Sequence, residues 1–146
     1  MKILSVNAGS SSLKFQLINM DERRVMASGG VEKVGFPEGI ITIKAGESKT
    51  TWNMEFPNHE VAVDVVLNTL LATEEAGLIC LDQIDAVGHR VVQGGDSFSE
   101  AALIDNEVFD IIEEYGAMAP LHNPAHLKGV EACNMEMPGT PQIAVF

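Results

Sequence analysis

Residues 7–14 (NAGSSSLK) place a glycine, three serines and a lysine close together near the start of the chain. Small residues let backbone N–H groups approach an oxyanion, hydroxyl groups donate hydrogen bonds to it, and an adjacent lysine supplies positive charge. Glycine and serine are equally typical of an ordinary turn. The residues alone therefore leave two interpretations open, a simple turn and a cradle for phosphate.

A Walker A phosphate loop is excluded by the residues that follow. That loop needs GxxxxGK[ST] at the start of a helix, and the second glycine-lysine pair is missing here. After the turn, apolar and polar residues alternate with the period of a strand. Ser12 and Lys14 share the polar face, and Ser10 lies in the turn beside them. The sequence predicts a strand-turn-strand unit with its polar groups on one side.

Arg90 stands among apolar residues in AVGHRVVQGG (residues 86–95). An arginine is costly to bury unless it meets an anion, and its planar fork suits a carboxylate or a phosphate. A structural ion pair with Asp or Glu, or an exit to solvent from a sheet edge, would explain it equally well. The neighbouring His89 should face the opposite side of the strand, where we expect a structural role.

His122 and His126 stand four residues apart in MAPLHNPAHLKG (residues 118–129). Pro124 suits the first turn of a helix, which leaves His122 just outside it, so the two rings need not share a face. No HExxH pattern is present, and a zinc site is disfavoured. The better functional interpretation is a single His122 at the mouth of a helix, donating to an oxyanion. A capping or surface histidine is the alternative.

The chain is acidic, with 9 Lys and Arg residues against 21 Asp and Glu residues and a net charge of −12. This argues against nucleic acid and anionic membranes as partners, because both need a cationic face. Cys80 and Cys133 form no CxxC pair, which fits a reducing, cytoplasmic location. A phosphate site in such a chain would depend on a few well-placed cations, backbone N–H groups and a metal ion.

The elements that must position these groups form a mixed α/β arrangement, which we expect to be one domain. The helix after residue 57 should be capped by Asn58 and stopped by Gly77. Its apolar stripe is expected at Val61, Val65, Leu67, Leu70 and Leu71. The expected order is strands at 2–7, 12–17 and 24–31, an edge hairpin at 40–56, a helix at 58–76, a strand at 84–92, helices at 106–115 and from about 124 toward 135, and a strand at 141–146.

Three stretches, in this order and at these spacings, resemble the acetate kinase (acetokinase) family of short-chain fatty-acid kinases. They are VNAGSSSLK at 6–14, GHRVVQGG at 88–95 and APLHNPAHLKG at 119–129, and the final PQIAVF is also similar to the family. The resemblance implies the ribonuclease-H-like α/β fold of the actin, sugar-kinase and chaperone-ATPase superfamily, with a mixed sheet and flanking helices. It also implies reversible, Mg²⁺-dependent transfer of the γ-phosphoryl group of ATP to acetate, giving ADP and acetyl phosphate.

The resemblance implies a nucleotide end and an acceptor end for the site. At the nucleotide end, Asn7 would help to hold the magnesium shell. The phosphates of ATP or ADP would be contacted by Ser10, Ser12 and Lys14. Phosphoryl transfer needs alignment and charge neutralisation more than covalent work, and these residue types suit it.

At the acceptor end, Arg90 would grip the acetate carboxylate or the transferring phosphoryl group, and His122 would stand near that phosphoryl group. Val92 and Leu121 would line the small pocket for the methyl group. The family usually has His where this sequence has Gln93, and Asn where it has His126. Gln93 can hydrogen-bond but cannot become cationic, which puts the local tuning of the site in question.

Length is the larger departure from the family. Acetate kinases have roughly 400 residues, two to three domains by the usual length prior. The resemblance places the catalytic aspartate of an Asp-Thr-x-Phe-His motif directly after Phe146. We therefore expect residues 1–146 to be the N-terminal domain, with 40–56 as an edge insertion and the C-terminal nucleotide-binding domain absent. Little or no kinase activity is expected of this chain alone.

Two other functions fit the same residues. A propionate or butyrate kinase is one, because acetate and propionate differ by one methylene, worth about 1–3 kcal/mol in a pocket. A non-catalytic half that acts by association is the other, since the surface facing the missing domain would be exposed. The full-length parent is expected to be a homodimer, and this chain could self-associate through the same exposed face.

Overall fold

The computed structural model describes residues 1–90, 102–104 and 123–145. The expected helix at 106–115 lies outside these residues, as do Val92, Leu121 and His122. The described elements are β1 (Lys2–Ala8), β2 (Ser12–Asn19), β3 (Arg24–Glu32), β4 (Gly39–Ala45), β5 (Ser48–Met54), α1 (His59–Ala72), η1 (Glu74–Ala76), η2 (Leu81–Gln83), β6 (Ala86–Arg90), β7 (Ala102–Leu103), α3 (Asn123–Glu136) and β8 (Gln142–Val145).

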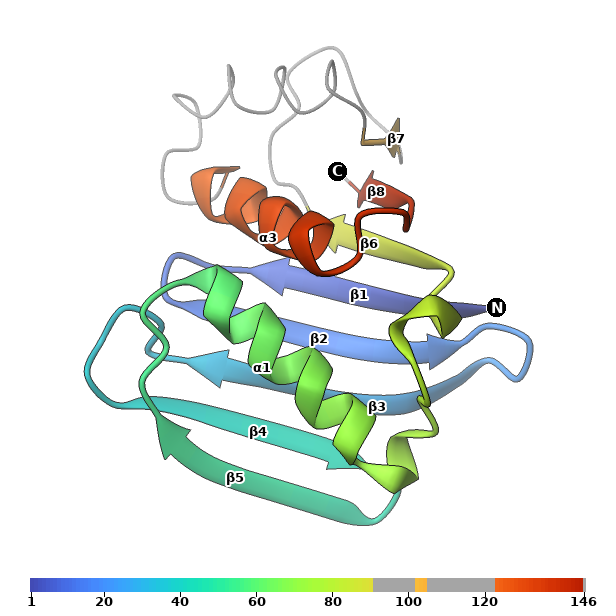
Figure 1. Cartoon of the computed structure of the whole chain (residues 1–146), viewed down its shortest axis with the longest axis horizontal. Helices are drawn as coiled ribbons and strands as arrows, with labels where there is room; N and C mark the ends of the chain where they lie inside the picture. Colours follow the sequence, from blue (N-terminus) through green and yellow to red (C-terminus); the bar gives the residue numbers. More distant parts are fainter. Residues whose placement is uncertain (91–101, 105–122, 146) are drawn as a thin grey trace.

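One sheet joins all the described strands, in the order β5-β4-β3-β2-β1-β6-β8-β7 (Figure 1). The first five strands follow one another as antiparallel neighbours. β6 runs parallel to β1, and β8 runs parallel to β6. Parallel neighbours need long crossover connections, and α1 and α3 lie on those connections. The mixed α/β arrangement and the edge position of the β4–β5 hairpin are confirmed.

β1 and β2 form the strand-turn-strand unit expected from the alternation. Leu13, Phe15 and Leu17 are buried, whereas Lys14 and Gln16 between them are exposed. Successive side chains of a strand point to opposite faces, so one residue type builds the core while its neighbour faces away. The alternation of β2 was therefore predicted correctly, both in its period of two residues and in which residues are buried.

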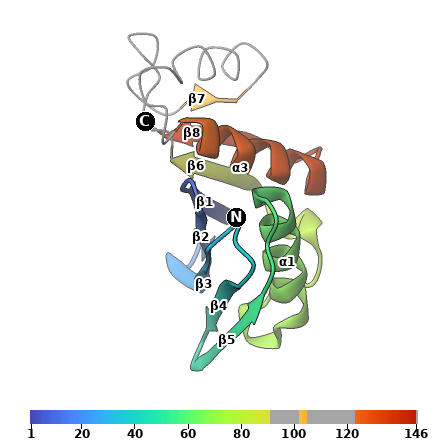
Figure 2. The ribbon, with the colours of Figure 1, turned by 90° about the vertical axis from the view of Figure 1, so that its left-hand side faces the viewer.

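The two helices cover the same face of the sheet, and the other face carries no helix from the described part of the chain (Figure 2). The covered face holds the core, formed by apolar side chains from β1 to β4, β6, α1 and the end of α3. α3 approaches the end of β1 closely. A Cβ added to Gly129 would lie 3.1 Å from the Cβ of Ala8, so the glycine permits this contact.

α1 begins as expected and ends earlier than expected. Asn58 caps it, since its side chain accepts a hydrogen bond from the Val61 N–H at 2.9 Å. The helix ends at Ala72, and Gly77, with φ of 72°, ends the following η1 turn instead. Thr73 has an extended backbone, and its hydroxyl group donates a hydrogen bond to the Thr69 carbonyl. At the end of the helix, this side chain therefore takes a carbonyl that a backbone N–H would otherwise use.

The apolar stripe of α1 also differs from the prediction. Leu67 and Leu70 are buried as expected, whereas Val61, Val65 and Leu71 are only partly buried. Valines and leucines occur around most of this helix, so periodicity alone did not define the buried side. The buried positions are His59, Ala62, Val63, Val66, Leu67 and Leu70.

No helix in the described ranges combines the length and the apolar character needed to cross a membrane.

Candidate functional site

Three adjacent strands bring Lys14, Asn7 and Arg90 into one row across the sheet. Asn7 on β1 is the register partner of Lys14 on β2. On the other side, β6 runs parallel to β1 with Val6 opposite His89. The next residue of β6, Arg90, therefore lies beside Asn7. The row is on the face without described helices, because its neighbours in the chain point into the core.

The cations of this row are exposed. Lys14 and Arg90 are exposed, and Asn7 between them is half-buried. Within residues 1–90, 102–104 and 123–145, neither cation has a carboxylate partner. Arg90 also has a strand on each side, β1 and β8, so it does not leave from a sheet edge. Neither structural alternative for Arg90, an ion pair or an edge position, applies among the described residues.

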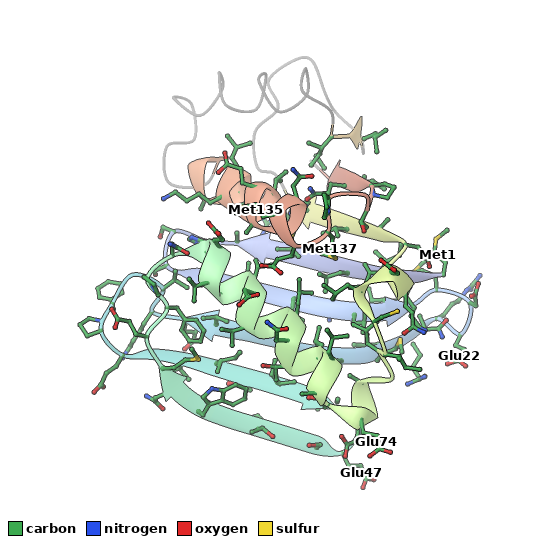
Figure 3. All side chains as sticks on the ribbon, viewed as in Figure 1. Met1, Glu22, Glu47, Glu74, Met135 and Met137 are labelled. Carbon is green, nitrogen blue, oxygen red and sulfur yellow. The ribbon has the colours of Figure 1, made fainter. Side chains whose placement is uncertain are left out.

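Acidic groups lie at both ends of the sheet, and the exposed Glu32 on β3 is the register partner of Ser12. The described ion pairs join the N-terminal amino group to Asp21 and Arg24 to Glu22, at the turn between β2 and β3. In Figure 3, Glu22, Glu47 and Glu74 lie at that same end, away from the end of β1. In a chain of net charge −12, with Glu32 near the turn, the row therefore depends on the two cations Lys14 and Arg90, neither of which has a carboxylate partner among the described residues.

A hollow of about 300 Å³ adjoins the row on the same face of the sheet. Sequence reasoning missed its polar side chains other than those of Asn7 and Lys14. Ser5 pairs with Gln16 across β1 and β2, and Gln16 pairs with Ser28 across β2 and β3. The alternation of β2 already gave the direction of Gln16. The hollow is lined by Ser5, Asn7, Lys14, Phe15, Gln16, Ser28 and Gly29.

The turn between β1 and β2 is held by three hydrogen bonds. The Gly9 N–H donates to the Ser12 carbonyl at 2.9 Å, and the Val34 N–H donates to the Ser11 carbonyl at 2.9 Å. The ring of His59, at the start of α1, bonds the Gly9 carbonyl at 2.7 Å. A Cβ on Gly9 would lie 2.5 Å from the Ser12 Oγ, so only glycine leaves that hydroxyl in place.

Ser10 and Ser12 differ in exposure within this turn. Ser10 is exposed, and Ser12, the first residue of β2, is half-buried. The strand register puts Ser12 on the same face as Lys14, as the sequence predicted. Their phosphate contacts stay a prediction, and so do the roles of Asn7 and Arg90.

His89 supports Arg90 from the covered face. It is 2% exposed, and its Nε2 donates to the Oε1 of Gln142 on β8 at 2.6 Å, since an amide oxygen only accepts. Burial lowers the pKa of His89 to about 4, and the nearby His126 acts in the same direction. The ring therefore stays neutral and links β6 to β8. The expectation that His89 faces away from Arg90 is confirmed.

The described residues suit a phosphate better than a tightly bound bare metal ion. Among them, no three His, Cys, Asp or Glu side chains gather to hold a metal. Mg²⁺ takes oxygen ligands and is commonly held by few protein groups together with phosphates and water. The amide oxygen of Asn7 fits such a part, and Lys14 and Arg90 fit the phosphates. His126 is buried in α3, and His122 lies outside the described residues.

Comparison with known proteins shows which sequences and structures this chain is similar to. The acetate kinase of Desulfitobacterium hafniense (strain DSM 10664 / DCB-2) is 47% identical over 147 residues, which cover 100% of this chain and 37% of that protein. The crystal structure of Porphyromonas gingivalis acetate kinase matches with a TM-score of 0.95 and 41% identity, over 99% of this chain and 37% of that one. A propionate kinase from Francisella tularensis subsp. tularensis SCHU S4 matches with a TM-score of 0.89 and 36% identity, over 99% and 36% of the two chains.

The chain thus spans about 37% of the length of the D. hafniense relative, and it corresponds to the N-terminal portion of such relatives. The fold class expected from the resemblance is confirmed, because the sheet and helices match the ribonuclease-H-like N-terminal domain of acetate kinase. Since residues 2–146 also match the sequence profile of the Acetokinase family, the chain belongs to that family.

Proposed function

We propose that the whole protein is an acetate kinase and that this chain is its N-terminal domain, supplying half of the active site. The reaction is the reversible transfer of the γ-phosphoryl group of ATP to acetate, with Mg²⁺, in the cytoplasm. The row of Lys14, Asn7 and Arg90 carries the proposal. It supplies two exposed cations on either side of an amide, next to a turn rich in hydroxyl groups.

In this proposal, the turn and Lys14 bind the phosphates of the nucleotide. Ser10 and Ser12 donate hydrogen bonds, and Lys14 neutralises charge on the phosphate oxygens. Asn7 would hold the magnesium shell through its amide oxygen, and bound Mg²⁺ would neutralise further charge on the phosphates. Because Lys14 and Arg90 flank Asn7, a phosphate chain above Asn7 would meet positive charge from both sides.

Arg90 serves the acceptor. Its guanidinium fork can hold the acetate carboxylate or the transferring phosphoryl group, and either use orients the reacting groups for in-line attack. The acetate carboxylate is already charged, so attack requires no strong general base. We propose that His122 stands near the same phosphoryl group and that Val92 and Leu121 line the methyl pocket.

A propionate kinase is the second candidate, favoured by the likeness to the F. tularensis structure. Both candidates use the same phosphate groups and differ in the acyl pocket. A methylene discriminates by about 1–3 kcal/mol, so the rates should differ by a measurable factor. Measuring kcat/KM of the whole protein for acetate, propionate and butyrate decides between the two candidates. Acetate is expected to give the highest value.

The experiment uses a chimera in which this chain replaces the matching N-terminal portion of the D. hafniense acetate kinase. We expect the chimera to form acetyl phosphate from ATP and acetate, and this chain alone to form little or none. An inactive chimera that is folded by circular dichroism would contradict the proposed function. Turnover by this chain alone at the rate of the chimera would contradict the assignment of half a site.

Association is a separate aspect of the proposal. The parent enzyme is proposed to be a homodimer, and the face without described helices could let this chain self-associate. Sedimentation of the purified chain tests this. A monomer at high concentration would count against self-association of the chain. It would not affect the kinase proposal, which the chimera tests separately.

A further inference from the structure

We propose that His59 is a positioning residue that aims a backbone N–H group of the turn at the phosphates; the inference rests on the proposed function. His59 is the first residue of α1 and is 4% exposed. Its Nε2 lies 2.7 Å from the carbonyl oxygen of Gly9, fifty residues earlier in the chain. The bond joins the helix layer to the turn that follows β1.

The direction of this hydrogen bond is fixed by chemistry. A backbone carbonyl only accepts, so the Nε2 of His59 carries the hydrogen. Both the neutral Nε2–H tautomer and the cationic form of histidine can donate from this atom. Glutamine offers an amide N–H, whereas leucine fills similar space and offers no donor.

The geometry of the peptide group converts this bond into an orientation. The carbonyl of Gly9 and the N–H of Ser10 belong to one planar peptide group, and the described chain has no cis peptide bonds. In a trans peptide the C=O and N–H point in opposite directions. α1 lies on the covered side of the sheet (Figure 2). By holding the Gly9 carbonyl toward α1, His59 directs the Ser10 N–H away from it.

Two other carbonyl groups of the turn are also held by hydrogen bonds. The carbonyl groups of Ser11 and Ser12 accept from the N–H groups of Val34 and Gly9, each at 2.9 Å. In contrast, the N–H groups of Ser10 and Ser11 have no protein acceptor within the described ranges. Small turns with free N–H groups bind anions. Lys14, beside Asn7 on the adjoining strand, would meet the same anion.

The kinetic test compares two variants in the chimera. His59→Leu should raise the KM for Mg·ATP about tenfold, the effect of one lost hydrogen bond to a part-buried group. The KM for acetate should stay near its original value, because Arg90 is on another strand. His59→Gln keeps a donor and should recover most of the nucleotide affinity. A merely structural role would give no such split between the two substrates.

A matched control removes general destabilisation as an explanation. Val66 is buried on the same helix, seven residues after His59, and does not touch the turn through any hydrogen bond. Val66→Ala should lower stability and leave the KM for Mg·ATP unchanged. The proposal is overturned if His59→Leu leaves that KM unchanged, or if Val66→Ala raises it equally.

A second readout needs no activity. In amide NMR spectra of the ligand-free chain, His59→Leu should shift or broaden the Ser10 resonance, and His59→Gln should return it toward its original position. If His59→Leu fails to fold, His59→Asn, whose shorter amide falls short of the Gly9 carbonyl, is compared instead. An unchanged Ser10 resonance overturns the inference. An inactive chimera with His59 intact would contradict the proposed function only, so the two failures are distinguishable.

Discussion

The two faces of the sheet have different tasks, although the same strands build both. Leu13 is 1% exposed against the helices, and its neighbour Lys14 is exposed on the other face. His89 is buried and neutral, and its neighbour Arg90 is exposed and charged. A step of one residue therefore separates stability from the proposed chemistry. Substitutions at neighbouring positions should change different measured quantities.

The largest expected effect is on the face without described helices. Lys14→Met in the chimera should lower kcat/KM for acetyl phosphate formation by about 100- to 1,000-fold, as removal of a charge-stabilising group does elsewhere. The free energy of unfolding should change by less than about 0.5 kcal/mol, because the side chain is exposed. Kinetics and urea unfolding on the same preparation measure both. A large loss of stability with little loss of activity would contradict the comparison.

The neighbouring substitution should do the reverse. Leu13→Ala removes a buried side chain and should lower the free energy of unfolding by about 2–5 kcal/mol. Urea unfolding of the chain measures it. Below the unfolding transition, the remaining folded chimera should keep its KM for Mg·ATP. A selective rise of that KM would show that the two faces are not separable at this position.

The buried histidine gives the covered face a pH dependence. The pKa of His89 is lowered from 6.5 to about 4, so between these values the unfolded state binds more protons than the folded state. Stability from this group is complete above about pH 6.5 and falls as the pH drops toward 4, by about 3 kcal/mol in total. Glu136 acts in the opposite direction, because burial and Asp64 raise its pKa.

His89→Gln isolates this contribution, since the variant lacks the titrating ring. Urea unfolding at several pH values between 6.5 and 4 should show a shallower decline for the variant than for the original chain. Titrating groups that do not interact with His89, Glu136 among them, contribute to both and cancel in the difference, whereas any effect that acts through the neighbouring His126 is included in it. Equal declines in the two proteins would show that His89 does not titrate as its burial requires.

The smallest expected effect is at the cap of α1. Asn58→Ala removes the acceptor of the Val61 N–H and should cost about 1 kcal/mol. Thermal or urea unfolding measures it, with Asn58→Ser as the control that restores a capping acceptor. His59 follows Asn58 directly, so the effects of the two substitutions on stability can be compared. If Asn58→Ala lowers the free energy of unfolding more than His59→Leu does, the start of α1 is stabilised mainly by the cap.

Local patterns predicted the strands well. The alternation from Ser12 to Leu17 gave both the period and the buried face of β2, and the hairpin expected at 40–56 is observed as β4 and β5. The predicted end of α1 was wrong, because Gly77 ends the separate η1 turn. β7 has two residues, Ala102 and Leu103, too few for any periodic signal.

The sequence allowed the residues of the candidate site to be proposed one by one, but it did not predict how they are arranged. Asn7, Lys14 and Arg90 were found from their types and from the family resemblance. Their row depends on the register of β1 with β2, which is local, and on that of β1 with β6, which joins positions more than eighty residues apart. His59 was missed because its partner, Gly9, lies fifty residues away and a backbone carbonyl leaves no sequence signal.

The most direct test of the central claim is an amide NMR titration of this chain with Mg·ADP. The claim is that one end of the face without described helices binds phosphate. We expect shifts confined to residues 7–14 and to Arg90, and we expect Lys14→Met to abolish them while Leu13→Ala leaves them in the folded fraction. Shifts that cluster elsewhere, or that persist unchanged in Lys14→Met, would contradict the account.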